Sequence, residues 1–165
     1  MAIVERLPKI KPFNWRDHGP RVLQFQYEVY ERNFPGFRVT QAFLADYERQ
    51  IRQALRNPFE GLWVLEEKGA LVGFIWAAIM TTLVDERLGY VKNLYIAPTT
   101  RGQGYGARLL AVAEDWMRSL GCPRAALDVT VENETAVALY QRSGYRVKRY
   151  RMEKDLTGGE EDGLL

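Results

Sequence analysis

The sequence has few of the residues that build metal sites and disulfide frameworks. Among 165 residues there is one cysteine, Cys122, and one histidine, His18. A single cysteine cannot close an internal disulfide or supply a cysteine zinc cluster, and a single histidine excludes multi-histidine metal sites. We therefore predict no bound metal. Cys122, next to Pro123, is expected to be a buried structural residue, and His18 to lie at the surface or in the first turn of a helix.

Long apolar runs and an excess of one charge are also absent. The run at 71–80 is only half as long as the ~20 residues of a membrane span, and the N-terminus lacks the charged start and apolar core of a secretory signal. The net charge is +2, with basic and acidic residues interspersed, which disfavours nucleic acid and anionic membranes as partners. These features predict a cytoplasmic protein that binds neither.

The composition is that of an ordinary soluble globular domain. Hydrophobic residues make up 47% of the chain and charged residues 27%, which suits one domain at this length. We expect a single domain over residues 1–156. The remaining stretch, 157–165, carries three glycines and three acidic residues, so it is expected to form a disordered acidic C-terminal tail.

Hydrophobic periodicity and turn residues predict an α/β fold with a mixed, twisted, mostly antiparallel sheet and helices on both faces. The expected helices cover residues 17 or 19 to 30, 41–55 after the N-cap Thr40, 104–120 and 134–142. The expected strands cover residues 9–14, 62–67, 70–83, 88–97, 125–131 and, as a last strand or bent hairpin, 145–156. Lys68-Gly69 is typical of a tight hairpin turn, so the strands on either side of it should pair antiparallel.

The most informative stretch, 90–110, runs from a strand through a glycine-rich turn directly into a helix. Gly102, Gly104 and Gly106 let backbone N–H groups face inward and an anion come close, because glycine has no Cβ. The helix that begins behind them adds roughly half a positive charge at its N-terminus, and Arg101 adds a full one. This pattern predicts a phosphate site, although the glycine spacing alone fits a flexible connection equally well.

The G-x-G-x-G spacing differs from both the dinucleotide-binding and the nucleotide triphosphate motif. Two longer phrases are more specific: N-L-Y-I-A-P-x-x-R-G-x-G-x-G-x-x-L-L within 90–110, and N-E-T-A-x-x-L-Y-x-x-x-G-Y within 127–145. Together they resemble the GNAT superfamily of acetyl-CoA-dependent N-acetyltransferases. In that family the fourth and fifth strands splay apart in a V, and the pantetheine arm of CoA lies in the notch. The resemblance places these strands at 88–97 and 125–131.

The resemblance also implies a set of residues that bind acetyl-CoA. Backbone groups of Leu94, Tyr95 and Ile96 would follow the acetyl and pantetheine arm. The pyrophosphate would be held through the backbone of Arg101, Gly102, Gln103, Gly104, Tyr105, Gly106 and Ala107. Asn133 would reach the pantetheine or the cofactor amides. Alternatively Asn133 is the N-cap of the helix that begins at Glu134, and the two roles are compatible.

Tyr140 is the predicted general acid. In the family, the tyrosine of the L-Y-x-x-x-G-[FY] phrase faces the CoA sulfur and donates a proton or hydrogen bond to the departing thiolate, whose developing charge needs a donor. Helical spacing alone favours another interpretation, in which Tyr140 and Val137 simply pack on the sheet.

Asp128 is the predicted base, because an alkylamine with a pKa near ~10 is mostly charged at neutral pH and has to lose a proton before it attacks. Strand alternation places Asp128 on the face opposite Leu127 and Val129. Many family members have a glutamate near the start of the fourth strand, where this chain has about Tyr90. The alternatives are a solvated or salt-bridged carboxylate at position 128 and deprotonation by bulk water.

These residues predict an N-acetyltransferase that moves the acetyl group directly from acetyl-CoA to a primary amine, with acetyl-CoA as co-substrate and no metal. A small-molecule amine is favoured as the acceptor. A protein N-terminus or a lysine side chain is the alternative, and a non-catalytic acyl-CoA-binding sensor is an alternative of another class. The resemblance leaves a homodimer open, and the sequence does not identify the amine.

Overall fold

The structure, a computed structural model, describes residues 7–158. Its helices are α1 (Trp15–Asn33), α2 (Gln41–Ala54), the short 3₁₀ helix η1 (Pro98–Thr100), α3 (Tyr105–Ser119) and α4 (Glu134–Arg142). Its strands are β1 (Lys9–Pro12), β2 (Glu60–Glu67), β3 (Ala70–Met80), β4 (Leu88–Ile96) and β5 (Ala125–Ala126). Most of the predicted tail, 159–165, lies outside the described residues. None of the helices in the described part is long and apolar enough to cross a membrane.

The strands form one mixed sheet in the order β1-β2-β3-β4-β5. β1 to β4 pair antiparallel, and β4 and β5 pair parallel. The predicted turn between β2 and β3 is confirmed, with positive φ at both Lys68 and Gly69, as a two-residue hairpin turn requires. The prediction of an α/β fold with a mostly antiparallel sheet is therefore confirmed.

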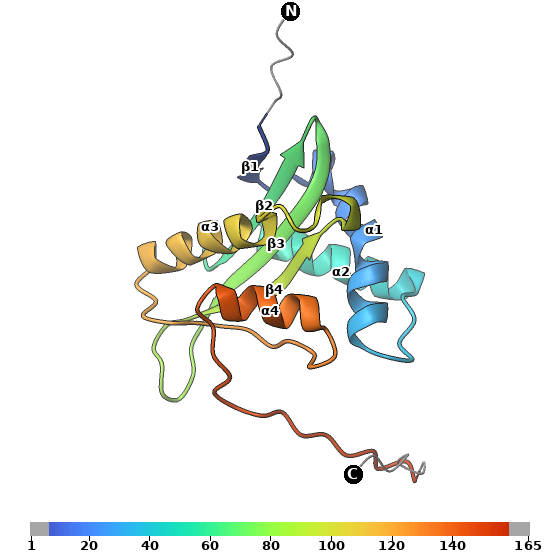
Figure 1. Ribbon diagram of the computed structural model, residues 1–165, viewed down its shortest axis with the longest axis vertical. Coiled ribbons are helices and arrows are strands. Elements are labelled where there is room, and N and C mark those ends of the chain that lie inside the picture. Colours follow the sequence, from blue (N-terminus) through green and yellow to red (C-terminus); the bar gives the residue numbers. More distant parts are fainter. Residues whose placement is uncertain (1–6, 159–165) are drawn as a thin grey trace, which may run out of the picture.

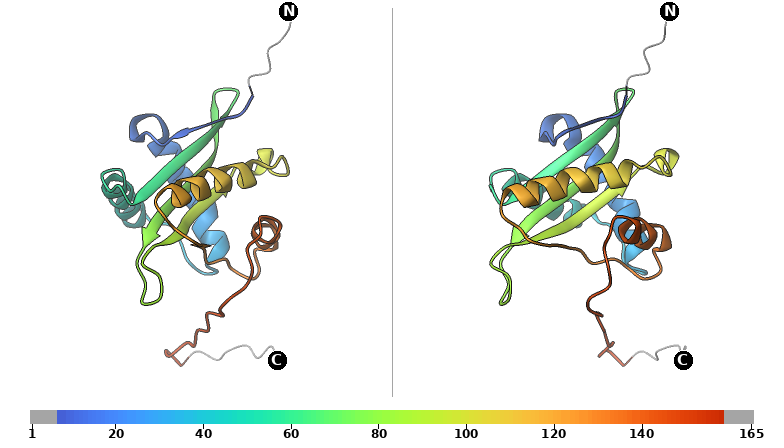
Figure 2. Two further views of the ribbon diagram at one scale, coloured as in Figure 1. Left: turned by 90° about the vertical axis from the view of Figure 1, so that its left-hand side faces the viewer. Right: turned by 60° about the vertical axis from the view of Figure 1, so that its left-hand side comes forward.

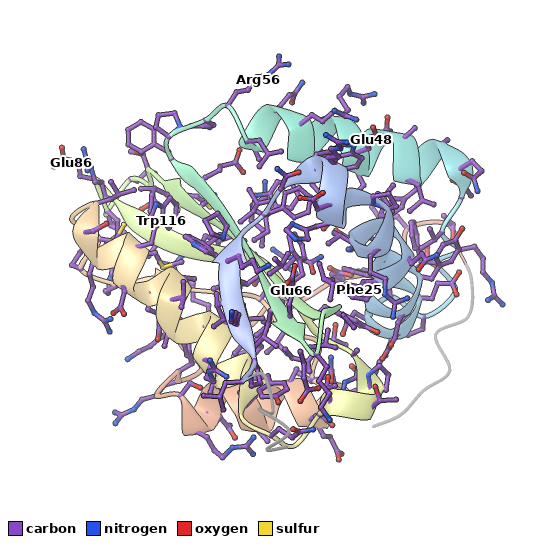
Figure 3. The ribbon with its side chains drawn as sticks, turned by 90° about the horizontal axis from the view of Figure 1, so that it is seen from above. Phe25, Glu48, Arg56, Glu66, Glu86 and Trp116 are labelled. Atoms are coloured by element: carbon purple, nitrogen blue, oxygen red, sulfur yellow. The ribbon has the colours of Figure 1, made fainter. Side chains whose placement is uncertain are left out.

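Helices cover both faces of this sheet (Figures 1 and 2). α1 and α2 lie on one face, where the buried Phe74 of β3 meets Phe13 with 5.8 Å between ring centroids. α3 lies across the other face, where Trp116 meets Trp63 of β2 at 5.4 Å. Figure 3 shows Glu48 on α2 and Trp116 on α3 at opposite sides of the sheet. The two apolar faces of the sheet are thus buried by two separate helical layers.

The first helix begins two residues before the earlier of its two predicted starts. Asn14 is its N-cap, with the side-chain oxygen accepting from the backbone N–H of Asp17 at 3.3 Å. His18 lies in the first turn as expected, but it is buried, so a surface position is wrong. The reason is that its ring makes internal contacts in place of water: Nδ1 accepts from the Asn14 N–H at 2.8 Å, and Nε2 lies 3.1 Å from a carboxylate oxygen of Glu66.

The C-terminal part of the sheet is shorter than predicted. β5 contains two residues rather than the predicted 125–131, and the segment 145–156 forms no strand in the described part of the chain. Val147, Tyr150 and Met152 are 68–90% exposed, and Figure 1 shows this segment leading away from the sheet. A β-prone sequence becomes a strand only beside a partner strand, and neither segment has one there. Cys122 is buried, as expected.

Candidate active site

The candidate site lies where β4 and β5 part. The two strands pair only at Gly89 with Ala125 and at Tyr90 with Ala126. Beyond this point β4 carries a β-bulge, because Trp76 and Ala77 of β3 are paired with Asn93 and Val91 and leave Lys92 without a residue opposite. The chain after β5 therefore diverges from β4, as the resemblance implies, but the diverging segment 127–131 is not a strand.

The parting leaves one edge of β4 open to a ligand. The N–H of Ala97 donates to the carbonyl of Val72 on β3 at 2.8 Å. Because successive residues of a strand direct their backbone groups to opposite edges, Leu94 and Ile96 direct theirs away from β3, toward the gap. The Ile96 carbonyl accepts from Nε of Arg101 at 2.9 Å, which agrees with this direction.

A cavity of about 400 Å³ lies along this open edge, within the size range of small-molecule sites. It is lined from four sides: the C-terminal half of α1, the end of β4, the turn that leads into α3, and α4. The lining residues are Glu28, Val29, Arg32, Asn33, Leu94, Tyr95, Ile96, Thr100, Arg101, Gly102, Gly104, Tyr105, Gly106, Asn133, Thr135, Ala136, Leu139, Tyr140 and Arg142. Most of the residues predicted from the sequence are therefore gathered in one place. Gln103, Ala107 and Asp128 are not among the lining residues.

The turn before α3 has the geometry of an anion site. Gly102 and Gly104 have φ values of +80° and +78°, in the left-handed region, and no heavy atom lies within 4 Å of a Cβ built on either. Gly104 is also the N-cap of α3, so no side chain caps the first N–H groups of that helix. The cavity is lined by three arginines and one glutamate. The backbone, the helix end and the excess of positive side chains all favour a negatively charged ligand.

The one acidic residue of the lining, Glu28, was not predicted from the sequence. Its carboxylate accepts from the Tyr95 hydroxyl at 2.6 Å and pairs with the Arg101 guanidinium at 2.5 Å; Arg32 lies 3.8 Å away. Burial raises the pKa of Glu28, but the hydrogen bonds from Tyr95 and Arg101 and the charge of Arg101 outweigh it, so the pKa lies below its usual value. Glu28 therefore stays ionised, and it neutralises the full positive charge that the sequence analysis gave to Arg101.

Tyr140 reaches the cavity from α4. Burial raises the pKa of its hydroxyl to about 12, so the group is a proton donor at neutral pH. Among the described residues the hydroxyl has no hydrogen-bond partner, and the ring lies edge-on to Tyr145 at 5.9 Å. Tyr140 packs against the core, as the packing interpretation predicts, and it also lines the cavity.

Asp128 lies two residues beyond the last β5 residue, at the fork where the chain after β5 diverges from β4. Its carboxylate accepts from the Tyr90 hydroxyl at 2.5 Å and lies 3.6 Å from the guanidinium of Arg151. The side chain is 57% exposed. Burial and the bond to Asp128 raise the pKa of Tyr90 to about 12. The structure therefore shows Asp128 as a paired carboxylate, the alternative considered above. It lies next to the gap and does not line the cavity.

Asn133 is the N-cap of α4 and also lines the cavity. Its side-chain oxygen accepts from the N–H of Ala136 at 3.3 Å, and its amide nitrogen donates to the side chain of Asn33 at 2.9 Å. The capping alternative is confirmed, and the bond to Asn33 ties α4 to the end of α1.

Sequence reasoning did not single out the lining residues of α1 and most of those of α4. The missed residues are Glu28, Val29, Arg32, Asn33, Thr100, Thr135, Ala136, Leu139 and Arg142. One local signal was available, since Glu28 and Arg32 are spaced four apart and share a helix face. Nothing local, however, connects that face with the turn at 101–106. In residues 7–158 no three His, Cys, Asp or Glu side chains lie close enough together to hold a metal ion.

Comparisons with known proteins place this site in a family. The model of the Acetyltransferase (GNAT) family matches residues 23–145. A mycothiol acetyltransferase from Streptomyces coelicolor is 38% identical over 85 residues, which are 52% of this chain and 26% of that protein. An aminoglycoside N(6')-acetyltransferase type 1 from Serratia marcescens is 27% identical over 115 residues, 64% of this chain and 79% of that protein. The chain thus spans about a quarter of the length of the mycothiol acetyltransferase.

Solved structures share the fold. Glucosamine-6-phosphate N-acetyltransferase from Arabidopsis thaliana has a TM-score of 0.68 at 20% identity, over 92% of this chain and 99% of that chain. An aminoglycoside N-acetyltransferase in complex with CoA has a TM-score of 0.72 at 18% identity, over 94% of this chain and 99% of that chain. The divergence of β4 from the chain after β5, the glycine turn before α3 and the family match over most of the chain lead to one conclusion: this protein belongs to the GNAT family of acetyltransferases.

Proposed function

We propose that the protein transfers the acetyl group of acetyl-CoA directly to a primary amine of a small molecule. The observation that carries the proposal is the cavity between β4, α3 and α4, which joins an open strand edge, an anion-binding turn and a proton donor in one continuous space. These three features match three parts of acetyl-CoA: the strand edge matches the arm with its two amides, the turn matches the diphosphate, and the proton donor matches the thioester.

The residues of the cavity fit these parts of the ligand. Backbone groups of Leu94 bind the amides of the pantetheine arm as a neighbouring strand would. The N–H groups at 102–107 hold the diphosphate at the start of α3, where the helix dipole favours negative charge. The predicted contacts of Gln103 and Ala107 have no such support, because neither residue lines the cavity.

Two side chains transfer protons in the reaction, one as a donor and one as an acceptor. Acetyl-CoA supplies the acetyl group as a thioester, which an unprotonated amine attacks so that a C–N bond forms and the C–S bond breaks. Tyr140 donates its proton to the leaving sulfur, and its pKa of about 12 keeps that proton in place at neutral pH. Asp128 accepts the proton of the amine, directly or through water, from its position at the fork beside Tyr90.

A small acceptor is supported by the relatives, since one is an aminoglycoside acetyltransferase and one a mycothiol acetyltransferase. We therefore favour a small amine over a protein N-terminus or a lysine side chain.

The test is acetyl-CoA turnover, followed as release of the CoA thiol, against aminoglycosides, amino sugars, polyamines, amino acids, lysine peptides and peptides with free N-termini. A blank without amine measures hydrolysis. Turnover with a small amine supports the proposal, and turnover with peptides alone contradicts the acceptor class. Acetyl-CoA binding without transfer to any amine would favour a sensor, and absence of CoA binding would overturn the proposal.

A further inference from the structure

Glu28 is a carboxylate in a cavity whose other charged residues are arginines. It lies on α1, far in sequence from the glycine turn, and reaches that turn through Arg101 at 2.5 Å. It also accepts from the Tyr95 hydroxyl of β4 at 2.6 Å. A carboxylate facing a diphosphate would weaken binding by repulsion, so its place in this cavity calls for another role.

Arg101 joins the glycine turn to two elements of the fold, β4 and α1. Its Nε donates to the carbonyl of Ile96 at the end of β4, one of its terminal nitrogens pairs with Glu28 on α1, and its guanidinium lies 5.7 Å from the ring centroid of Tyr95. The next residue, Gly102, has a left-handed conformation. Glycine is the residue with the most backbone freedom in the unfolded or loosened chain, so the turn depends on how firmly Arg101 is held at its start.

We propose that Glu28 is a positioning residue for the anion-binding turn: by holding Arg101 against the end of β4, it fixes the turn at 101–106 in the conformation that receives the diphosphate. This inference rests on the proposed function, because it takes CoA as the ligand. Glu28 acts through Arg101 and not on the reacting atoms. Tyr95 supports it as a second donor to the same carboxylate.

The proposal predicts a loss of affinity that is specific for the diphosphate. Glu28→Gln keeps the size of the side chain and removes its charge, so the pairing with Arg101 changes from a charge-assisted to a neutral hydrogen bond. We expect the Kd for CoA to rise roughly tenfold. The Kd for pantetheine, which has the arm without the diphosphate, should rise far less. Tyr95→Phe removes one donor and leaves the ion pair, so it should raise the Kd for CoA by less than Glu28→Gln does.

The experiment is isothermal titration calorimetry of CoA and pantetheine with the wild type, Glu28→Gln, Arg101→Gln and the double variant. Because Glu28 acts through Arg101, the double variant should bind CoA no more weakly than Arg101→Gln alone. Glu31→Gln is the matched control, since Glu31 lies on the same helix with similar exposure and pairs with Arg38 outside the cavity. Thermal melting checks that each variant is folded.

Three results would overturn the inference alone: wild-type affinity for CoA in Glu28→Gln, an equal loss for CoA and pantetheine, or additive effects of the two substitutions. Failure of the wild type to bind CoA would overturn the proposed function together with this inference, so the two failures are distinguishable.

Discussion

Replacing Tyr140 with phenylalanine removes one hydroxyl from the cavity and leaves the ring in place. Since no described residue bonds to that hydroxyl, the substitution orphans no buried partner, and the ring keeps its contact with Tyr145 at 5.9 Å. The free energy of unfolding should therefore change by less than about 0.5 kcal/mol. The chemical step loses its proton donor, and we expect kcat to fall about 100-fold, equivalent to about 2.7 kcal/mol in the activation barrier.

The pH profile adds an independent check. A pKa raised to about 12 means that Tyr140 keeps its proton through the neutral and mildly alkaline range, so its donor role is lost only as the pH approaches that value. The wild type should therefore show no fall in kcat from Tyr140 between neutral and mildly alkaline pH. An increase in rate as the pH rises from the acidic side reports the deprotonation of the amine and its base instead.

The assay is steady-state kinetics with the acceptor found in the panel, measured over a pH series beside thermal melting. Tyr145→Phe is the matched control: it removes the hydroxyl that donates to Glu114 at 3.1 Å, so it should cost about 1 kcal/mol of stability and leave kcat unchanged. An unchanged kcat in Tyr140→Phe would refute this role of Tyr140. So would a fall in wild-type kcat just above neutral pH that is absent from Tyr140→Phe, because Tyr140 would then lose its proton far below pH 12.

Four further substitutions test other features of the site and the fold. Asp128→Asn should lower kcat/KM at least about tenfold and remove its acidic limb if Asp128 is the base; an unmoved pH profile would leave deprotonation to bulk water. Gly104→Ala and Gly36→Ala each force a side chain into a left-handed backbone and should each cost about 1–2 kcal/mol in chemical denaturation, but calorimetry should show weaker CoA binding only for Gly104→Ala. Phe74→Ala, at a fully buried position, should destabilise the fold by about 3–5 kcal/mol in the same denaturation assay, and a much smaller loss would contradict its place at the centre of the core.

Features that depend on neighbouring residues could be predicted from the sequence. The Lys68-Gly69 turn forms because its residues accept positive φ, and the turn before α3 forms because Gly102 and Gly104 do. The N-cap at Thr40 is local as well: its hydroxyl accepts from the N–H of Phe43 at 3.1 Å. In each case the conformation is decided by chemistry within a few residues, which a sequence displays directly.

Features that need a distant partner could not be predicted. Glu28 and Arg101 are in contact although they are 73 positions apart in the chain, and no local sequence pattern predicts such a contact. The segments 127–131 and 145–156 have β-prone residues, but strand formation is a property of a pair of strands, and β4 has already turned away from the first of them. The order of the elements was therefore accessible from the sequence, while the α1 wall of the cavity was not.

Under the proposed function, binding of CoA in the gap beside β4 contributes to the stability of the fold. At Leu94 no strand is paired with the outer edge of β4. A ligand whose amides form hydrogen bonds with this edge takes the place of a neighbouring strand. Because such a ligand binds only the folded protein, it raises the free energy of unfolding of the region around β4. We expect amide hydrogens along this edge to exchange with solvent slowly only while the ligand is bound, and resistance to proteolysis to increase with the concentration of the ligand. Under the proposed function, the fold is most stable when acetyl-CoA is abundant.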